Sequence, residues 1–284
     1  MIKISVIIVN AGRDRHLRNV LEGILKGEHY PDEIIVVNVA ERLMDLKFYP
    51  KIKQVLIDPS TMKDALGIGE LRNIGAKAAS FDLLCFLDVD CIPSSTYFSM
   101  IVESRPLKNC LYMGTPRYMT SVVQEVDFDW LDHHSILHPA RPNFAQLTKY
   151  DDFCLFWSLC FYMYADDFNK LDGFDESFRG YGAEDTDFAL RAQSKHMEFW
   201  LSPFIIYHQQ HDLYRPPYHQ FRSIINNCET FYDRWKFWPM ENFLDSFHQD
   251  KFIVLRSDGS KIQILKEPSN RFIQSKKVCN EPFL

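Results

Sequence analysis

The sequence lacks the features of a disulfide scaffold, a zinc site or a membrane-spanning protein. Its seven cysteines are an odd number, none forms a C-x-x-C pair, and several lie inside apolar runs. Such cysteines behave as small buried hydrophobic residues and indicate a reducing compartment. The longest apolar run, residues 153–165, is shorter than the roughly twenty residues that a membrane helix needs. The N-terminus enters a strand pattern without a signal peptide, so we expect a cytoplasmic protein for which peripheral membrane contact stays open.

The chain also lacks an excess of positive charge. The 32 Lys and Arg against 38 Asp and Glu leave a net charge of −6, which excludes an extended basic surface for nucleic acid. Repeats and low-complexity tracts are absent, and the 46% hydrophobic content excludes a largely disordered chain. Aromatic residues are abundant and crowd into the second half of the chain. They fit a packed core, and they also fit stacking on sugar rings or bases.

What the sequence does contain is an alternation of strand and helix patterns. Short β-branched runs predict buried strands at 3–10, 32–39, 51–58 and 82–90. Helical spacing of apolar or small residues predicts helices at 14–27 and 69–80. This order is typical of a doubly wound α/β sheet, whose ligands bind beyond the carboxyl ends of the strands. Further along the chain we expect helices at 94–106, 184–196 and 217–239, and strands at 110–119 and 198–208. The segment 156–171 is expected to be a strand that runs into a helix. A hairpin is expected at 251–265, with its turn at Asp258-Gly259.

The fourth predicted strand ends in Asp88-Val89-Asp90. Residues i and i+2 of a strand face the same way, so both carboxylates can converge on one Mg²⁺ or Mn²⁺ ion. Acidic residues also gather at strand ends and turns without a metal, so the tripeptide alone decides little. His208 ends the strand expected at 198–208 and is a candidate third ligand, with His211 as a nearby competitor. A hydrogen-bonded surface histidine is the alternative for either.

Two other stretches carry candidate functional residues. Arg72, on the helix expected at 69–80, can neutralise a diphosphate with forked hydrogen bonds, or it can be an ordinary surface arginine.

The stretch 180–188, GYGAEDTDF, has glycines that permit close backbone approach. Glu184 and Asp185 then fall in a first helical turn, where acids complement the helix dipole. The functional alternative is that one of them is a general base.

Together these motifs resemble the family 2 glycosyltransferases of the GT-A fold. The similarity is strongest to the branch that includes bacterial chondroitin-type polymerases and the β-1,4-galactosyltransferase C-terminal motif. It runs from Ile4 to about Pro217 and is most specific in GFDESFRGYGAEDTDFALR, residues 173–191, and YHQ, residues 207–209. The resemblance implies a Rossmann-like mixed sheet flanked by helices with a small C-terminal appendage. We expect a GT-A domain at 1–245, divided into a nucleotide-binding half at 1–92 and an acceptor-binding half at 93–245, and a hairpin-containing extension at 246–284.

The resemblance also implies a nucleotide site. Its residues would be Asn10, Arg13, Arg15, Asn38, Arg72 and Asp88. Many family members carry Asp where this chain has Asn38, at the position that meets the base. An asparagine can still accept a hydrogen bond from the N3–H of uracil, which allows a UDP-linked donor.

The remaining roles follow from the same resemblance. Mn²⁺ or Mg²⁺ would be bound by Asp88, Asp90 and His208. Asp185 would be the catalytic base and Glu184 would hold the acceptor, beside a donor and acceptor pocket that includes Trp157 and Gly182. The implied reaction transfers a hexose or N-acetylhexosamine, with inversion, to a hydroxyl of a glycan, a lipid-linked sugar or another acceptor, as in polysaccharide biosynthesis.

Two alternative functions fit parts of the pattern. A catalytically silent nucleotide-sugar binding protein would need the Asp-x-Asp motif but not the Glu184-Asp185 pair. A phosphatase with an aspartate nucleophile also places Asp-x-Asp after an apolar strand. That class has Thr or Val two residues after the second Asp, where this chain has Ile92. A GT-A-like nucleotidyltransferase is disfavoured because no G-x-G-x-R loop follows the first strand.

Overall fold

The core of the molecule is one mixed β-sheet. The computed structural model describes residues 2–61, 67–255, 261–279 and 281–282. Within them, eight strands follow the order β3-β2-β1-β4-β9-β6-β10-β5, with β7 paired to β6 and β8 to β10. The strands are β1 (Ile4–Asn10), β2 (Glu33–Val39), β3 (Ile52–Ile57), β4 (Leu83–Asp88), β5 (Cys91–Pro93), β6 (Cys110–Met119), β7 (Ser135–Leu137), β8 (Thr148–Tyr150), β9 (Cys160–Tyr164) and β10 (Glu198–His208).

The long strands share one direction. β1 is parallel to β2 and β4, β2 is parallel to β3, and β6 is parallel to β10. β9 is antiparallel to both β4 and β6, so those two strands also run the same way. The carboxyl ends of β1, β2, β4, β6 and β10 therefore meet at one edge of the sheet, which is where ligands of open α/β sheets bind.

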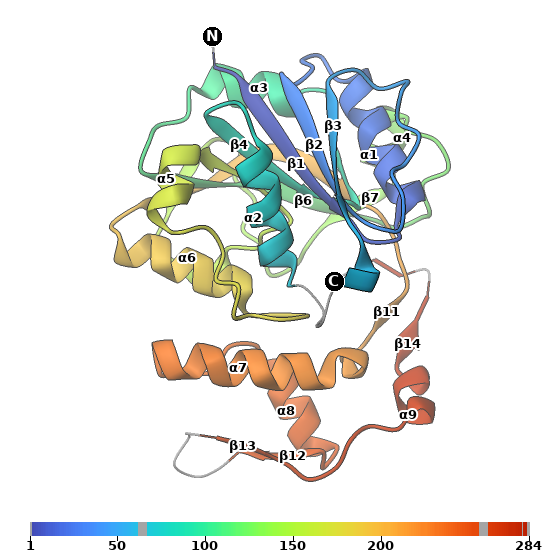
Figure 1. Cartoon of the computed structure of the whole chain (residues 1–284), viewed down its shortest axis with the longest axis vertical. Coiled ribbons are helices and arrows are strands. Elements are labelled where there is room, and N and C mark those ends of the chain that lie inside the picture. The colour runs from blue at the N-terminus through green and yellow to red at the C-terminus, as the bar shows by residue number, and fades with distance from the viewer. Residues whose placement is uncertain (1, 62–66, 256–260, 280, 283–284) are drawn as a thin grey trace.

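Helices cover both faces of the sheet (Figure 1). Alternate residues of β1 point to opposite faces, so Val6 and Ile8 join one buried cluster and Ile7 and Val9 join the other. The first cluster includes residues of α1 (Asp14–Lys26), α3 (Tyr97–Ser104) and α4 (Phe128–His133). The second includes residues of α2 (Ile68–Ala78), α5 (Ala165–Lys170) and α6 (Glu184–Ser194). This arrangement confirms the expected α/β sheet with flanking helices.

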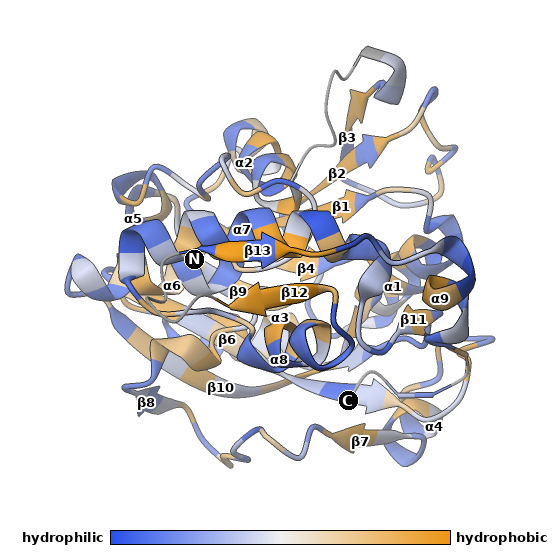
Figure 2. Cartoon of the chain, turned by 90° about the horizontal axis from the view of Figure 1, so that it is seen from below, coloured by the Kyte–Doolittle hydropathy of each residue, from blue (hydrophilic) through white to orange (hydrophobic). Residues whose placement is uncertain are grey.

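A third buried cluster lies below the sheet in Figure 1. It is built by α7 (Phe221–Trp235), α8 (Glu241–Gln249), the strands β12 (Ile253–Leu255) and β13 (Ile262–Ile264), and the neighbouring α9 (Asn270–Ser275). Figure 2 shows β12 and β13 coloured largely as hydrophobic residues. Two short strands, β11 (Leu213–Tyr214) and β14 (Lys277–Val278), pair the beginning and end of this segment. We call residues 213–279 the C-terminal unit.

The C-terminal unit differs in extent from the extension expected at 246–284. Helix α8 runs across residue 245, and its buried Leu244 and Phe247 lie in one cluster with Phe221 of α7. We propose that the unit begins near residue 213, where β11 leaves the part of the chain that contains the large sheet. The predicted hairpin strands pair as β12 and β13, while the predicted turn at Asp258-Gly259 lies outside the described residues.

Other differences from the sequence predictions are local. The strand expected at 82–90 ends at Asp88, and a separate short strand, β5, follows after a turn. The polar segment 127–146, for which the sequence indicates a loop or short helices, contains the short helix α4 and also the strand β7, which was not predicted. Helices α8 and α9 were not predicted either. None of the helices in the described part of the chain combines the length and the apolar character required to cross a bilayer.

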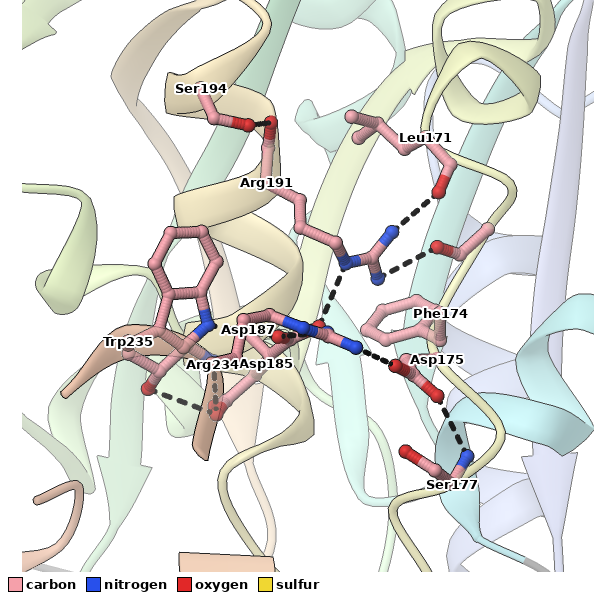
Figure 3. Close-up of polar contacts among 12 residues, drawn as sticks. Leu171, Phe174, Asp175, Ser177, Asp185, Asp187, Arg191, Ser194, Arg234 and Trp235 are labelled. Carbon is pink, nitrogen blue, oxygen red and sulfur yellow. Dashed lines mark hydrogen bonds and ion pairs between the residues drawn. The ribbon is translucent and has the colours of Figure 1, made fainter. Parts of the chain in front are cut away.

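A buried carboxylate links the part of the chain that contains the large sheet, from β1 to β10, to the C-terminal unit (Figure 3). We call this part the sheet domain. Asp187, on α6, is fully buried and accepts hydrogen bonds from three side chains. Arg191 Nε lies 2.8 Å from Asp187 Oδ2, while Arg234 Nη1 at 2.5 Å and Trp235 Nε1 at 2.9 Å donate to Oδ1. Because Arg234 and Trp235 belong to α7, the first turn of α6 is fixed to the C-terminal unit.

A second link holds the loop that precedes α6. Asn227, buried on α7, donates through Nδ2 to the carbonyl oxygens of Arg179, Tyr181 and Gly182 at 2.9–3.1 Å. Its Oδ1 accepts from the backbone N–H of Arg179 at 3.1 Å. One side chain therefore satisfies four backbone groups of this loop and fixes its path.

Replacing Asp187 by Asn should lower the free energy of unfolding by about 2 kcal/mol, because the neutral amide cannot accept hydrogen bonds from Arg191, Arg234 and Trp235 as the buried carboxylate does. Denaturant titration measures this change. Asp166 is a matched control, since it forms an exposed ion pair with Lys108, and Asp166→Asn should leave stability unchanged. Equal stability of the two variants would contradict a structural role for the Asp187 link.

Candidate active site

A short backbone pairing brings Asp90 beside two histidines. β5 pairs antiparallel with the end of β10, placing Cys91 opposite His208. The backbone N–H of Gln209 donates to the carbonyl oxygen of Asp90 at 2.7 Å. As a result His208 Nε2 lies 3.6 Å from Asp90 Oδ1, and His211 Nε2 lies 3.7 Å from Asp90 Oδ2. We call Asp90, His208 and His211 the metal group.

The metal group fits a divalent cation. One ligand atom from each residue lies within 4.8 Å of the others. Burial alone would raise the pKa of Asp90, but His208, Arg13 and His211 outweigh it and hold that pKa below its usual value. Burial, aided by Arg13, lowers the pKa of His211. An ionised carboxylate and a neutral imidazole are the protonation states that bind a metal. The carboxylate oxygen suits Mg²⁺ or Mn²⁺, and imidazole nitrogen is a general ligand of divalent transition metals.

Asp88 lies beside this group but has a different partner. Its Oδ1 accepts a hydrogen bond from Arg72 Nη2 at 2.7 Å, and the same nitrogen contacts the carbonyl oxygen of Ser158 at 3.2 Å. Arg72 is buried, and its Nη1 has no hydrogen-bond partner within the described part of the chain. Because β4 ends at Asp88 and Asp90 lies in the following turn, the i, i+2 argument for two converging carboxylates does not hold here.

The loop after β1 places only part of the predicted nucleotide residues at the site. Arg13 forms an ion pair with Asp90. Arg15 instead contacts the Val123 carbonyl oxygen at 3.1 Å and Gln124 Oε1 at 2.6 Å, away from the metal group.

Two asparagines, Asn10 and Asn38, hold that loop through hydrogen bonds. Asn10 Oδ1 accepts from the backbone N–H of Arg13 at 3.0 Å, and Asn10 Nδ2 donates to Asn38 Oδ1 at 3.1 Å. The Nδ2 of Asn38 donates to Gln54 Oε1 at 2.8 Å. Both side chains are buried and hydrogen-bonded within the protein, so direct contact of either with a nucleotide stays a prediction.

Glu184 and Asp185 begin α6, as the sequence predicts. The preceding loop turns through Gly182, at φ +97°, and Ala183, in the left-handed region at φ 71°. The positive φ of Gly182 favours glycine, and a Cβ there would lie 2.5 Å from the sulfur of Met240, so that the end of this flexible side chain would have to move. Burial, followed by the charge of Asp185, raises the pKa of Glu184 to about 7. Burial also raises the pKa of Asp185, against the hydrogen bond from the Thr186 N–H.

Two adjoining cavities open beside these groups. The larger, about 620 Å³, is lined by the metal group, Arg13, Arg72, Asp88, Trp157 and residues 180–186, together with Met240, Asn242 and Phe243 of the C-terminal unit. The smaller, about 420 Å³, is lined by the end of β1, by Ile68 and Leu71 of α2, and by Arg13, Asp88, Asp90, Gly180, Tyr181 and Gln220. The acid pair and the metal group therefore share one cavity.

A row of rings forms another wall of the larger cavity. The ring centroids of His208 and Tyr118 lie 5.1 Å apart, those of Tyr118 and His138 5.7 Å, and those of His138 and Trp157 4.9 Å. The guanidinium of Arg141 packs 3.5 Å from the centroid of Trp157. Burial lowers the pKa of Arg141 to about 10, which leaves a positive charge behind this wall at neutral pH.

Sequence reasoning found part of this site. The structure brings together Arg13, Arg72, Asp88, Asp90, Trp157, Gly182, Glu184, Asp185 and His208, and it places His211 with Asp90 beside His208. Tyr118, His138 and Arg141 were missed, and so were Met240, Asn242 and Phe243. The aromatic enrichment of the second half was a signal for Phe243 alone, and it did not distinguish a cavity wall from the core.

Comparison with known protein families and sequences identifies glycosyltransferases as the similar proteins. The model for "glycosyltransferase like family 2" matches residues 5–230. Validoxylamine A glucosyltransferase of Streptomyces hygroscopicus subsp. jinggangensis (strain 5008) is 28% identical over 145 residues, covering 44% of this chain and 34% of that protein. Chondroitin synthase of Pasteurella multocida (strain Pm70) is 24% identical over 239 residues, covering 74% of this chain and 25% of that protein. The chain thus spans a quarter to a third of the length of these relatives.

Solved structures show the same fold. GalNAc-T7 with UDP, GalNAc and Mn²⁺ superposes with a TM-score of 0.56 at 14% identity, covering 73% of this chain and 44% of that one. Residues 1–349 of S. aureus TarS in complex with UDP-GlcNAc superpose with a TM-score of 0.54 at 14% identity, covering 74% and 59%. Both are glycosyltransferases of the GT-A fold. With a family match over most of its length and this architecture, the chain belongs to the glycosyltransferase-like family 2 and has the GT-A fold.

Proposed function

We propose that this chain is a metal-dependent, inverting glycosyltransferase that moves a hexose or N-acetylhexosamine from a UDP-sugar to a hydroxyl of a glycan or lipid-linked acceptor. The observation that carries the proposal is the larger cavity, which is lined by both the metal group and the Glu184-Asp185 pair. A binding protein would need the first but has no use for half-buried acids with raised pKa values.

The donor would occupy the two cavities in sequence. The smaller cavity, between the end of β1 and α2, suits the nucleoside, and Arg13 and Asp88 line both cavities where the diphosphate would cross. Arg72 lines the larger cavity, and its Nη1, which has no hydrogen-bond partner in the described residues, is a donor that suits a phosphate oxygen. Bound Mn²⁺ or Mg²⁺ would neutralise the charge that develops on the departing diphosphate, held by Asp90, His208 and His211.

The transfer is a single displacement at the anomeric carbon. The acceptor oxygen forms a bond to that carbon on the face opposite the diphosphate, and the carbon–oxygen bond to the diphosphate breaks with its electron pair on the leaving group. Asp185 takes the proton of the acceptor hydroxyl as the new bond forms. Because the pKa of Glu184 is about 7, this carboxyl is partly protonated at neutral pH and can donate a hydrogen bond to the acceptor.

A thermal-shift screen tests the donor. A ligand that binds only the folded state raises the apparent melting temperature by mass action. We expect UDP-sugars to raise it in the presence of Mn²⁺ more than GDP- or dTDP-sugars, and EDTA to remove the effect. A larger shift with GDP- or dTDP-sugars would overturn the uridine assignment, and shifts unchanged by EDTA would overturn the metal role.

Replacing Asp185 by Asn should abolish sugar transfer and leave nucleotide-sugar binding within about twofold of the wild-type value. The amide keeps the size of the side chain but cannot take a proton. Transfer is measured as acceptor-dependent UDP release, and binding by titration calorimetry with the intact donor. Turnover that survives in this variant would show that another residue is the base.

The acid limb of the pH profile should lie above the range of an ordinary carboxyl group, which titrates near about pH 4. Asp185 works only when ionised, and burial raises the pKa of both acids, so kcat/KM should fall as the pH drops through their raised pKa values. Glu184→Gln removes a neighbouring negative charge and should move the limb to lower pH. A limb that stays in place in this variant, or lies near pH 4 in the wild type, would contradict the assignment.

Asp90→Ala, His208→Ala and His211→Ala should each weaken Mn²⁺-dependent UDP binding by at least about tenfold, since each removes one of three protein ligands. Calorimetric titration of UDP with Mn²⁺ and with EDTA measures the effect. His133→Ala is the matched control, because His133 is exposed on α4. If His211→Ala behaves like His133→Ala, the metal group contains only Asp90 and His208.

A further inference from the structure

The C-terminal unit contributes three residues to the larger cavity, and nothing in the proposed reaction so far uses them. We propose that Met240, Asn242 and Phe243, which line the larger cavity together with Tyr181, form the acceptor subsite, which takes a sugar ring by stacking its apolar face on an aromatic side chain. This inference rests on the proposed glycosyl transfer and adds the surface that selects the acceptor. The C-terminal unit would then determine which hydroxyl receives the sugar.

The position of these residues separates them from the nucleotide. The smaller cavity is lined by β1, α2, the Asp88–Asp90 turn, Gly180, Tyr181 and Gln220. Of the two cavities, Met240, Asn242 and Phe243 line the larger one alone, with Glu184 and Asp185, whereas Tyr181 lines both. A ligand in contact with residues 240–243 is therefore on the side of the acid pair. That is where the hydroxyl to be deprotonated must lie.

The chemistry of this wall suits a carbohydrate. Tyr181 is 38% exposed, which is high for a large aromatic residue beside a cavity, and Phe243 is half-buried. Aromatic faces of this kind stack on the C–H face of a sugar ring. Asn242 is exposed, and while its Oδ1 accepts from the Phe243 N–H at 3.0 Å, its Nδ2 can donate to a sugar hydroxyl.

Backbone hydrogen bonds and core packing fix the position of residues 240–243, which form this wall of the cavity. Met240 adopts a left-handed conformation at φ 51°, and its carbonyl oxygen accepts from the N–H groups of Phe243 at 2.9 Å and Leu244 at 3.3 Å. Leu244, one residue after Phe243, is buried in the third cluster. On the other side Asn227 fixes the carbonyl of Tyr181 at 3.1 Å. Both walls are thus anchored to α7 and α8.

The loop at Tyr181-Gly182 and the segment at 240–243 lie in close contact. Gly182 follows Tyr181, and a Cβ there would lie 2.5 Å from the sulfur of Met240, so that the Met240 side chain would have to move away. The glycine therefore lets the segment at 240–243 approach the catalytic loop directly. Glu184 and Asp185 follow two and three residues after this contact, so an acceptor ring held by Tyr181 and Phe243 would present a hydroxyl to the acid pair.

The test measures UDP release with and without an acceptor panel. UDP-glucose, UDP-galactose, UDP-N-acetylglucosamine and UDP-N-acetylgalactosamine are the donors, with Mn²⁺. The acceptors are the methyl β-glycosides of glucose, galactose, N-acetylglucosamine, N-acetylgalactosamine and glucuronic acid. For the donor and acceptor that work best, Phe243→Ala and Asn242→Ala should each raise the KM for the acceptor by about tenfold, as expected for loss of a stacking or hydrogen-bond contact.

The controls separate acceptor binding from folding and from the donor. Phe243→Tyr keeps an aromatic face and should restore an acceptor KM close to that of the wild type. Phe237→Ala removes another exposed aromatic residue from the same segment, 42% exposed, and should change neither KM. The KM for the UDP-sugar should change by less than about twofold in all variants, and their melting temperatures are compared with that of the wild type.

The outcomes distinguish the two levels of the proposal. If Phe243→Ala and Asn242→Ala raise the donor KM instead, or leave the acceptor KM unchanged, the acceptor subsite is wrong and glycosyl transfer stands. If the wild type releases no UDP from any donor with any acceptor, the proposed function fails and the subsite fails with it. If Phe243→Ala melts at a much lower temperature than the wild type, Asn242→Ala decides alone, because Asn242 is exposed and not part of the third cluster.

Discussion

The backbone pairing between β5 and the end of β10 is the contact on which the proposed metal site depends. Only three register pairs join these strands, yet they set Asp90 opposite the residue after His208. Without this pairing the turn after β4 would leave Asp90 at the end of one strand and His208 at the end of another. In the paired structure the burial of Asp90 acts to raise its pKa, and the charges of His208, Arg13 and His211 outweigh this effect and hold the pKa low.

The proposed catalytic acids, Glu184 and Asp185, depend on a second set of contacts, and these come from the C-terminal unit. Asn227 satisfies four backbone groups of the loop before α6, and Asp187 joins the first turn of α6 to Arg234 and Trp235. The two sets converge on one cavity, with the metal group supplied by the sheet and the acid pair by a helix that α7 holds in place. The unit is therefore a structural part of the site, which makes its further contribution of Met240, Asn242 and Phe243 physically reasonable.

Strong periodicity made much of the fold predictable. Helix 184–196 and strand 198–208 were expected within two residues of α6 and β10, because apolar spacing defines such elements locally. Asp90 and His208 could be predicted to meet because parallel strands end at one edge. The direction of Arg15 toward Val123 could not, since it depends on a loop far along the chain. Nor could the wall at Met240, which needs a left-handed residue and tertiary packing of α8.

The central claim is that one cavity places a metal-bound leaving group and the Asp185 base on opposite faces of the transferred sugar. The anomeric configuration of the product tests it most directly, by proton NMR of the reaction mixture during turnover of an α-linked UDP-sugar. The account predicts a β-linked product, because the acceptor attacks opposite the diphosphate. An α-linked product would contradict it, since retention requires a different arrangement of nucleophile and leaving group.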